Sequence, residues 1–368
     1  MGLAVLLWGM STTVGQEIAR CEPCDPCGGN SGFFTLTFGG WVESGIYTNN
    51  RNKDNNGPMH PASHARTDFQ MNQLYLFGEK EMDTKHGFDW GGRADLVYGT
   101  DASGMQCFDQ TFDADWGNNR HGYGLAAYQL YGTLGYKDLS VKIGKFITPI
   151  GWEEAASKNN IFYSHSYCYW IEPATHSGAL ATYDWSDRLS VSAGWTTGMD
   201  SSFKNPGNNS AVLSGITYLL SDDATVYYWI SAGKQSDEER ADYFVQSLCL
   251  EWALTDRFTY VHQYNLRNDN NGDGRYSSYG INNHFLYKLT DKLTAGTRVE
   301  WLRDNGGFGY FTDEPGDYWQ VTLGLRWNPS EHLSVRPEVR YDCYRGSAAP
   351  FAGSHDQVSG GCGMLLSF

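Results

Sequence analysis

Residues 317–341, DYWQVTLGLRWNPSEHLSVRPEVRY, decide the fold. In the first half of this stretch, apolar residues such as Trp319, Val321 and Leu323 alternate with polar or small ones, and a second alternating run follows a turn at 328–332. A side-chain period of two indicates β-strands, and two such runs around a turn that holds a proline indicate an antiparallel hairpin. One face of each strand is apolar and the other carries charge, so the hairpin predicts a sheet with an oily side and a polar side.

The same hairpin recurs through the second half of the chain. Tight turns centred on Asp187, Asp222, Asp256 and Asp291 follow one another at about 35 residues, which is an internal repeat. Longer polar loops separate the hairpins, at 198–210, 234–241, 268–275, 304–316 and 344–355. Earlier strands are predicted at 33–47, 69–82, 87–98, 124–136 and 139–146. Short turns at one end and long loops at the other are typical of outer-membrane barrels, and the segments amount to about sixteen strands, an even number as such barrels require.

Two other architectures compete with a barrel. A propeller blade recurs at about 40 residues but packs four short strands into that span, and the strands of a soluble sandwich are nearer five or six residues. Here each repeat holds two strands of about ten to thirteen residues, a length that crosses a bilayer when the strand is tilted. Aromatic residues near both strand ends suit the two water–lipid boundaries. They are Trp185, Trp252, Tyr287, Trp327 and Phe258 beside tight turns, and Tyr98, Trp195, Tyr264, Trp301 and Tyr341 towards the long loops. We therefore predict an all-β fold, a closed antiparallel transmembrane β-barrel with short periplasmic turns and long extracellular loops.

Charge and hydropathy exclude two other classes of protein. The chain has 368 residues and a formal net charge of −15. This acidic balance argues against nucleic acid as a partner, because phosphates require a basic patch. No run of about 18 apolar residues occurs, so no membrane helix is predicted.

The chain divides into three predicted parts. Residues 1–15 resemble a signal peptide, 16–31 form a leader rich in Cys, Gly and Pro, and 32–368 form the barrel. The last strand ends on Phe368, and a terminal aromatic resembles the assembly signal of Gram-negative outer-membrane proteins. Closure requires this strand to pair with the first one, because an open edge in lipid leaves backbone groups unsatisfied. We expect partners in outer-membrane lipid and the barrel-assembly machinery, and a homotrimer by analogy with porins.

The cysteines suggest disulfides or packing rather than a metal site. Cys21, Cys24 and Cys27 have no nearby His or fourth Cys to complete a tetrahedral set, so local disulfides or links between chains are expected. Cys107 and Cys168 fall in two predicted loops and could pair. The segment at 269–274 imitates half of a calcium loop, but position twelve of an EF-hand would be a glycine, so no metal and no cofactor are predicted.

About sixteen tilted strands leave a water-filled lumen. The alternation places a set of charged residues on its wall: Glu43, Asp89, Arg93, Asp95, Lys142, Glu251, Arg298, Glu300, Arg326, Arg336, Glu338, Arg340 and Asp342. Facing acidic and basic walls tune which ions pass through a pore. The alternative is that these charges only hydrate the lumen and pair across neighbouring strands.

The loop at 149–175 is too long and too apolar for a passive connector. A loop of this composition should bury itself, and the space available is inside the barrel. We expect its side chains to constrict the channel, with these candidates: Trp152, Glu153, Glu154, Lys158, Tyr163, His165, Tyr167 and Glu172.

The amino-acid sequence around this loop resembles that of a known family. The segments GKFITPIGWE (144–153), NIFYSHSY (160–167) and EPATHSGALATY (172–183) are similar to the beta-barrel porin-2 (OmpL-like) family, and the resemblance covers most of 33–368. It implies an outer-membrane channel of unassigned solute, with no site residues to carry over.

The function predicted is a porin for passive diffusion of small hydrophilic solutes or ions. A structural or adhesive barrel with an occluded lumen is the alternative. An outer-membrane hydrolase is a third hypothesis, since His165 lies between Ser164 and Ser166 and His176 precedes Ser177, but a triad is a matter of geometry. We therefore expect that the protein is not an enzyme.

Overall fold

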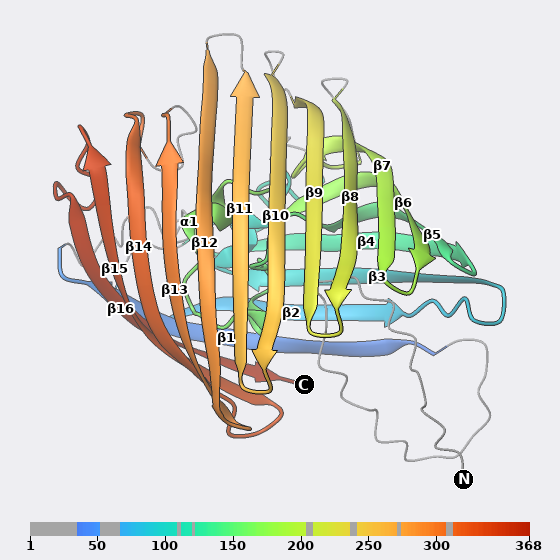
Figure 1. Cartoon of the computed structure of the whole chain (residues 1–368), viewed down its shortest axis with the longest axis horizontal. Helices are drawn as coiled ribbons and strands as arrows, with labels where there is room; N and C mark the ends of the chain where they lie inside the picture. Colours follow the sequence, from blue (N-terminus) through green and yellow to red (C-terminus); the bar gives the residue numbers. More distant parts are fainter. Residues whose placement is uncertain are drawn as a thin grey trace.

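A computed structural model of the chain describes residues 35–51, 67–108, 112–119, 122–203, 209–235, 241–270, 274–306 and 312–368. These residues form one closed barrel of sixteen antiparallel strands (Figure 1), which confirms the predicted fold class. The predicted signal peptide and the cysteine-rich leader lie outside the described residues.

Each strand pairs with the strands before and after it in the chain. The strands are β1 (Thr37–Asn49), β2 (Gln70–Lys80), β3 (Phe88–Gly99), β4 (Gly124–Tyr136), β5 (Leu139–Ile147), β6 (Thr175–Ser186), β7 (Leu189–Met199), β8 (Ser210–Ser221), β9 (Ala224–Gln235), β10 (Ala241–Thr255), β11 (Phe258–Asn270), β12 (Arg275–Thr290), β13 (Leu293–Asp304), β14 (Gly316–Trp327), β15 (Leu333–Gly346) and β16 (Asp356–Ser367). Three short helical turns, η1 (Asp101–Gly104), η2 (Ser157–Asn159) and α1 (Tyr167–Trp170), lie in the connections. In the described part of the chain no helix is long and apolar enough to cross a membrane.

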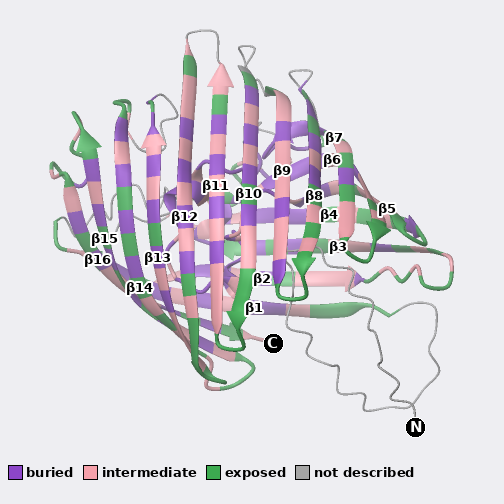
Figure 2. Ribbon diagram, viewed as in Figure 1, coloured by how far each residue is buried: buried purple, intermediate pink, exposed green. Residues whose placement is uncertain are grey.

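The wall has an apolar outer face because side chains alternate along every strand. On β14, Trp319 and Leu323 are 44% and 57% exposed, whereas the intervening Gln320 and Thr322 are at most 1% exposed. In Figure 2 buried residues also alternate with less buried ones along other strands, for example β12. Large exposed apolar side chains therefore face outward, which suits lipid, and polar side chains face inward.

The barrel closes between its first and last strands. β1 pairs with β16 from Trp41 opposite Ser367 to Asn49 opposite Ser359. Phe368 adds two main-chain hydrogen bonds to Gly40, at 2.9 and 3.0 Å. No edge is left between these strands, so the backbone groups that would face lipid are paired.

The connections differ at the two ends of the barrel, as predicted. Two-residue turns join β4 to β5, β6 to β7, β8 to β9, β10 to β11 and β12 to β13. The connections at the opposite end are longer, and the longest one described throughout is the β5–β6 connection, residues 148–174.

The ladder between β4 and β5 is incomplete. The two strands pair only from Leu130 opposite Lys145 to Tyr136 opposite Leu139, so residues 124–129 of β4 are outside the ladder with β5. Asp113, from the β3–β4 connection, fills the gap and accepts hydrogen bonds from the amide of Ala127 and from Lys145 Nζ, at 2.9 and 3.1 Å. A buried ion pair thus replaces part of the strand ladder.

The β3–β4 connection also contains Cys107, one of the two cysteines that were considered for a disulfide. The amide of Cys107 donates to Asp113, at 3.0 Å, whereas Cys168 lies on α1, and both cysteines are free and buried. The pairing of Cys107 with Cys168 is therefore wrong.

The terminal residue provides a test of how the barrel assembles. Phe368→Ala keeps both main-chain hydrogen bonds to Gly40 and removes a ring that is 61% exposed. We expect the fraction of protein inserted in the outer membrane to fall several-fold. The free energy of unfolding of barrels refolded in detergent should change by only about 0.5 kcal/mol, because surface substitutions have small effects.

Heat-modifiable electrophoretic mobility of membrane fractions and urea unfolding measure the two quantities. Val358→Ala, at the other end of the same strand and 42% exposed, is the control. Normal insertion of the Phe368→Ala chain would show that the terminal ring is no assembly signal.

Candidate functional site

The connection between β5 and β6 folds into the barrel. We call residues 148–174 the inner loop. Ile161 and Phe162 are buried, and the ring of Tyr167 on α1 packs against Tyr318 of β14 with ring centroids 5.0 Å apart. Figure 1 shows the inner loop in green behind β12. The apolar and aromatic residues of this segment find their burial there, inside the wall rather than outside it.

Four arginines on adjacent strands hold the main chain of the inner loop. They are Arg298 on β13, Arg326 on β14, and Arg336 and Arg340 on β15. The acceptors are the carbonyl oxygens of Ser157, Asn160 and Phe162 for Arg336, of Lys158, Asn159 and Asn160 for Arg326, of Ser164 and His165 for Arg298, and of His165 for Arg340, at 2.5 to 3.2 Å. A guanidinium offers five N–H donors, so one arginine can bond to more than one main-chain carbonyl of the loop.

Two glutamates on the same wall bind the amides of the inner loop. Glu338 accepts from the amides of Tyr163 and Ser164, the first at 2.8 Å. Glu300 accepts from the first two amides of α1, at 2.8 and 2.6 Å. The wall therefore supplies cations to the carbonyls of the loop and carboxylates to its amides.

One ion pair joins a loop side chain to this wall. Arg298 Nη1 donates to Glu153 at 2.6 Å, and the amide and hydroxyl of Ser166 donate to the same carboxylate at 2.7 and 2.6 Å. Burial alone would raise the pKa of Glu153, but Arg298 and these hydrogen bonds hold it at about 2. Burial lowers the pKa of His165 to about 4, so this imidazole is neutral at pH 7 and Arg298 is the cation that holds Glu153.

The inner loop also reaches the opposite strands. Gln263 and Asn265 on β11 both donate to the carboxyl of Glu172, whose pKa burial raises. Trp152 Nε1 donates to Glu251 on β10 at 3.1 Å. The contacts of the loop thus extend from β15 round to β10.

A third set of contacts fixes the loop against β1 and β2. Gln73 donates to the carbonyl of Ala155 at 2.7 Å and accepts from the amide of Ser157 at 3.2 Å. The ring of Tyr163 lies against Gly45 and Gly363, where an added Cβ would come within 2.6 and 2.5 Å of it. Sequence reasoning missed Gln73, Gln263 and Asn265. They could have been found as Asn or Gln residues at inward-facing positions of predicted strands.

The structure places the predicted charges on the inner face, but it differs from a wall lined by water. Glu43, Asp95, Arg298, Glu300, Arg336, Glu338 and Arg340 are buried, each at most 5% exposed. Asp342 is also buried, and Asp89, Arg93, Lys142, Glu251 and Arg326 are partly exposed. The physical reason on β13–β15 is the inner loop, which lies between these charges and the remaining lumen.

The eight side chains expected to constrict the channel fall into two groups. Glu153, Tyr167 and Glu172 are buried in the contacts described above, whereas Trp152, Glu154, Lys158, Tyr163 and His165 are partly exposed. The second group is the part of the inner loop that keeps some solvent exposure.

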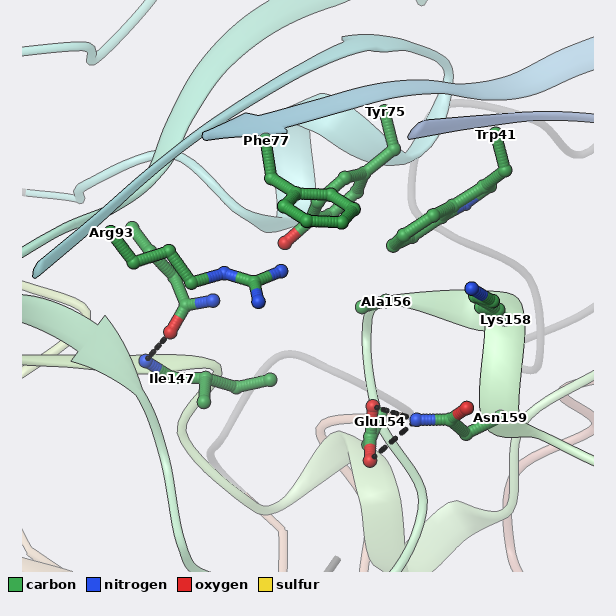
Figure 3. Close-up of a pocket in the computed structure, with 10 residues that line it drawn as sticks. Trp41, Tyr75, Phe77, Arg93, Ile147, Glu154, Ala156, Lys158 and Asn159 are labelled. Atoms are coloured by element: carbon green, nitrogen blue, oxygen red, sulfur yellow. Dashed lines mark hydrogen bonds between the residues drawn. The ribbon is translucent and has the colours of Figure 1, made fainter. Parts of the chain in front are cut away.

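A small cavity lies between the inner loop and strands β1–β5 (Figure 3). Its volume is about 30 Å³, room for roughly two water molecules. It is lined by Trp41, Tyr75, Phe77, Arg93, Gln129 and Ile147 from the wall, and by Glu154, Ala156, Lys158 and Asn159 from the loop. Charged groups and rings therefore meet here with space between them.

The serine and histidine neighbours do not form a triad. The Ser164 hydroxyl accepts from Arg298, the Ser166 hydroxyl donates to Glu153, and His176 Nε2 lies 3.1 Å from the hydroxyl of Thr148. Within the described residues no hydrogen bond joins a serine hydroxyl to either histidine. Nor do three His, Cys, Asp or Glu side chains gather there as a metal site would require.

Comparison with solved structures shows the porin fold. An anion-selective porin from Comamonas acidovorans is 11% identical with a TM-score of 0.62, over 91% of this chain and 99% of its own. OmpT of Vibrio cholerae, in a trimer form, is 11% identical with a TM-score of 0.60 over 91% and 99%. Salmonella typhi OmpF in complex with daunomycin is 12% identical with a TM-score of 0.63 over 90% and 97%. At these identities the likeness concerns the fold alone.

A search of curated proteins finds no match. The family described as "Putative beta-barrel porin-2, OmpL-like" matches residues 35–368, the whole of the barrel. Together with the apolar outer face and the porin fold, this match makes the protein an integral β-barrel of the outer membrane. The chain belongs to the beta-barrel porin-2, OmpL-like, family.

Proposed function

We propose that the protein is a diffusion channel for small hydrophilic solutes or ions, narrowed by the inner loop. The observation that carries this proposal is the asymmetry of the loop. Its buried side is bound to the wall by wall arginines and glutamates, while Trp152, Glu154 and Lys158 remain partly exposed. A barrel of sixteen strands is wide enough for an aqueous channel. A loop that is fixed to the wall inside such a barrel narrows the lumen permanently.

The wall that the inner loop leaves uncovered supports the same proposal. Lys142 on β5, Thr182 on β6 and Thr217 on β8 point inward and are partly exposed. Polar side chains that solvent reaches from the inside provide hydration for a passing solute. The passage would therefore run between the exposed side of the inner loop and strands β3–β9.

A structural or adhesive barrel with an occluded lumen is the second candidate. The observation that favours it is the extent of apolar packing inside the wall. One interior cluster joins Trp41, Tyr75 and Tyr128 to Ala155 and Ala156 of the inner loop. Stepwise ohmic currents in planar bilayers support the channel, and their absence from well-folded protein supports the structural role.

Assembly and partners belong to the same proposal. The trimer form of the Vibrio cholerae OmpT supports a homotrimer for this chain as well. Contacts with outer-membrane lipid and the barrel-assembly machinery follow from the location. Catalysis is not part of the proposal, because the serine hydroxyls near His165 are bonded to Arg298 and Glu153.

Removal of the inner loop tests whether it narrows the channel. We expect deletion of residues 152–170 to raise single-channel conductance several-fold, because the deleted residues occupy part of the cross-section of the lumen. Exchange of residues 236–240, between β9 and β10, for a glycine linker is the control. Unchanged conductance of the deletion variant would show that the loop does not constrict the channel.

A single anchor provides a milder test. Arg298→Met removes the donors to Glu153 and Ser164 and leaves a buried carboxylate without its cation, a change that typically costs about 3–5 kcal/mol. We expect frequent current fluctuations and a larger mean conductance in planar bilayers. Arg303→Met is the control, because Arg303 lies on the same strand but is 31% exposed and pairs with Asp317. Equal currents from both variants would contradict the anchoring role.

A solute series measures the width of the passage. In liposome-swelling assays we expect rates to fall steeply from a pentose to a disaccharide, and the deletion variant should admit the disaccharide. Equal rates for all sugars in the wild-type protein would contradict a channel narrowed by the loop.

A further inference from the structure

The cavity between the inner loop and strands β1–β5 combines rings with cations. Arg93 lies over the ring of Phe77 at 4.4 Å, and Lys158 Nζ is 6.0 Å from the centre of the Trp41 ring. Figure 3 shows the guanidinium of Arg93 pointing into the cavity, with Lys158 on the far side beside Trp41. Two cations from opposite walls thus face one small space.

The carboxylates on the strands are already used. Arg93 Nε donates to Asp95 at 2.8 Å, and Nη1 donates to Glu79 at 2.9 Å. Asp95 also accepts from the hydroxyl of Tyr75 and from Gln129. These bonds fix the guanidinium, and none of the hydrogen bonds among the described residues uses its Nη2. With Nε and Nη1 bonded to Asp95 and Glu79, Nη2 is the charged N–H group of Arg93 that can donate to an anionic ligand in the cavity.

The one carboxyl that the inner loop contributes is weakly acidic. Asn159 Nδ2 donates to both oxygens of Glu154, at 3.3 and 3.2 Å. Burial raises the pKa of Glu154 to about 7. At pH 6 this carboxyl is mostly neutral, so it opposes an anion only at higher pH.

The size and lining of the cavity limit the ligand. A space for roughly two water molecules holds the two oxygens of a carboxylate and excludes a whole solute. Ile147 and Ala156 add apolar surface next to the cations. The ligand group that fits is a carboxylate joined to an apolar body that remains in the lumen.

We propose that this cavity is a subsite that binds the carboxylate of small organic acids passing through the channel. The proposal rests on the proposed channel function and specifies its substrate class. Arg93 and Lys158 would bind the carboxylate, while Phe77 and Trp41 would contact the apolar body of the acid. The acid would reside briefly at the edge of the inner loop before it moves on.

Block of ionic current by a matched pair of probes tests the subsite. Benzoate and benzamide have nearly the same shape, and only benzoate is charged. In planar bilayers we expect benzoate to reduce the current of the wild-type channel in a saturable manner and benzamide to leave it unchanged. Lys158→Gln should weaken the block about fivefold, a change typical of losing one partly exposed ion pair. Lys85→Gln, in the exposed β2–β3 turn, should leave it unchanged.

The pH dependence adds a second readout. The charged or titratable groups that face Glu154 are Arg93, Lys158, Tyr128 and Tyr227, and arginine, lysine and tyrosine side chains ordinarily keep one state between pH 6 and 8. We therefore expect wild-type block to be stronger at pH 6 than at pH 8. Glu154→Gln should block at both pH values as the wild type does at pH 6.

The outcomes separate the subsite from the channel itself. A well-folded wild-type protein without conductance steps would overturn the proposed channel function. A conducting channel that benzoate and benzamide affect equally, or a block that Lys158→Gln leaves unchanged, would overturn the subsite alone. Preferential block by benzyltrimethylammonium would also overturn it, because it would show a site for cations.

Discussion

A chain segment placed inside a barrel must find partners for its own backbone, and this requirement governs the arrangement of the interior. The inner loop has little regular secondary structure, so only a few of its amides and carbonyls bond to one another, as the amide of Asn160 does to the carbonyl of Ser157. An unpaired buried polar group costs about 1–3 kcal/mol. The wall provides the missing partners. Arg336 serves three carbonyls, and Glu300 and Glu338 each serve two amides. The same bonds give these buried charged side chains hydrogen-bond partners.

This use of charge divides the barrel into two functional parts. The wall from β13 to β15 binds the inner loop, and Arg298, Arg336 and Arg340 are buried there. In the proposed channel, solute would meet the other side of the loop, where Glu154 and Lys158 lie opposite Arg93. Charge on the strands alone is then a poor guide to selectivity. In the proposed channel, the exposed side of the loop and the wall that faces it would determine which solutes pass.

The sequence predicts the wall better than the interior, for a physical reason. Alternation with a period of two residues shows which side chains share a face, and the turns show where strands end. The strands, their pairing and closure through the last strand therefore follow from the pattern. The aromatic content of 149–175 also predicts that this loop is buried. Periodicity does not show what covers the inner face, so Arg298 and Arg340 were expected to meet water. Lys145 illustrates a second limit. Its position in the alternation of β5 predicts an outward side chain, yet Lys145 is buried in an ion pair with Asp113. The reason is that the β4–β5 ladder stops at Lys145 and the β3–β4 connection occupies the gap. Such a gap depends on contacts between segments far apart in the chain.

Hydrogen–deuterium exchange of the folded barrel in lipid tests the central claim most directly. The amides of Tyr163, Ser164, Tyr167 and Cys168 donate to Glu338 and Glu300, so they should exchange as slowly as strand amides. Replacement of Glu300 by glutamine should accelerate exchange at Tyr167 and Cys168 more than at Tyr163. Exchange of all four amides at the rate of an unstructured peptide in the wild-type protein would show that the loop is not held by the wall, and would contradict this account of the channel.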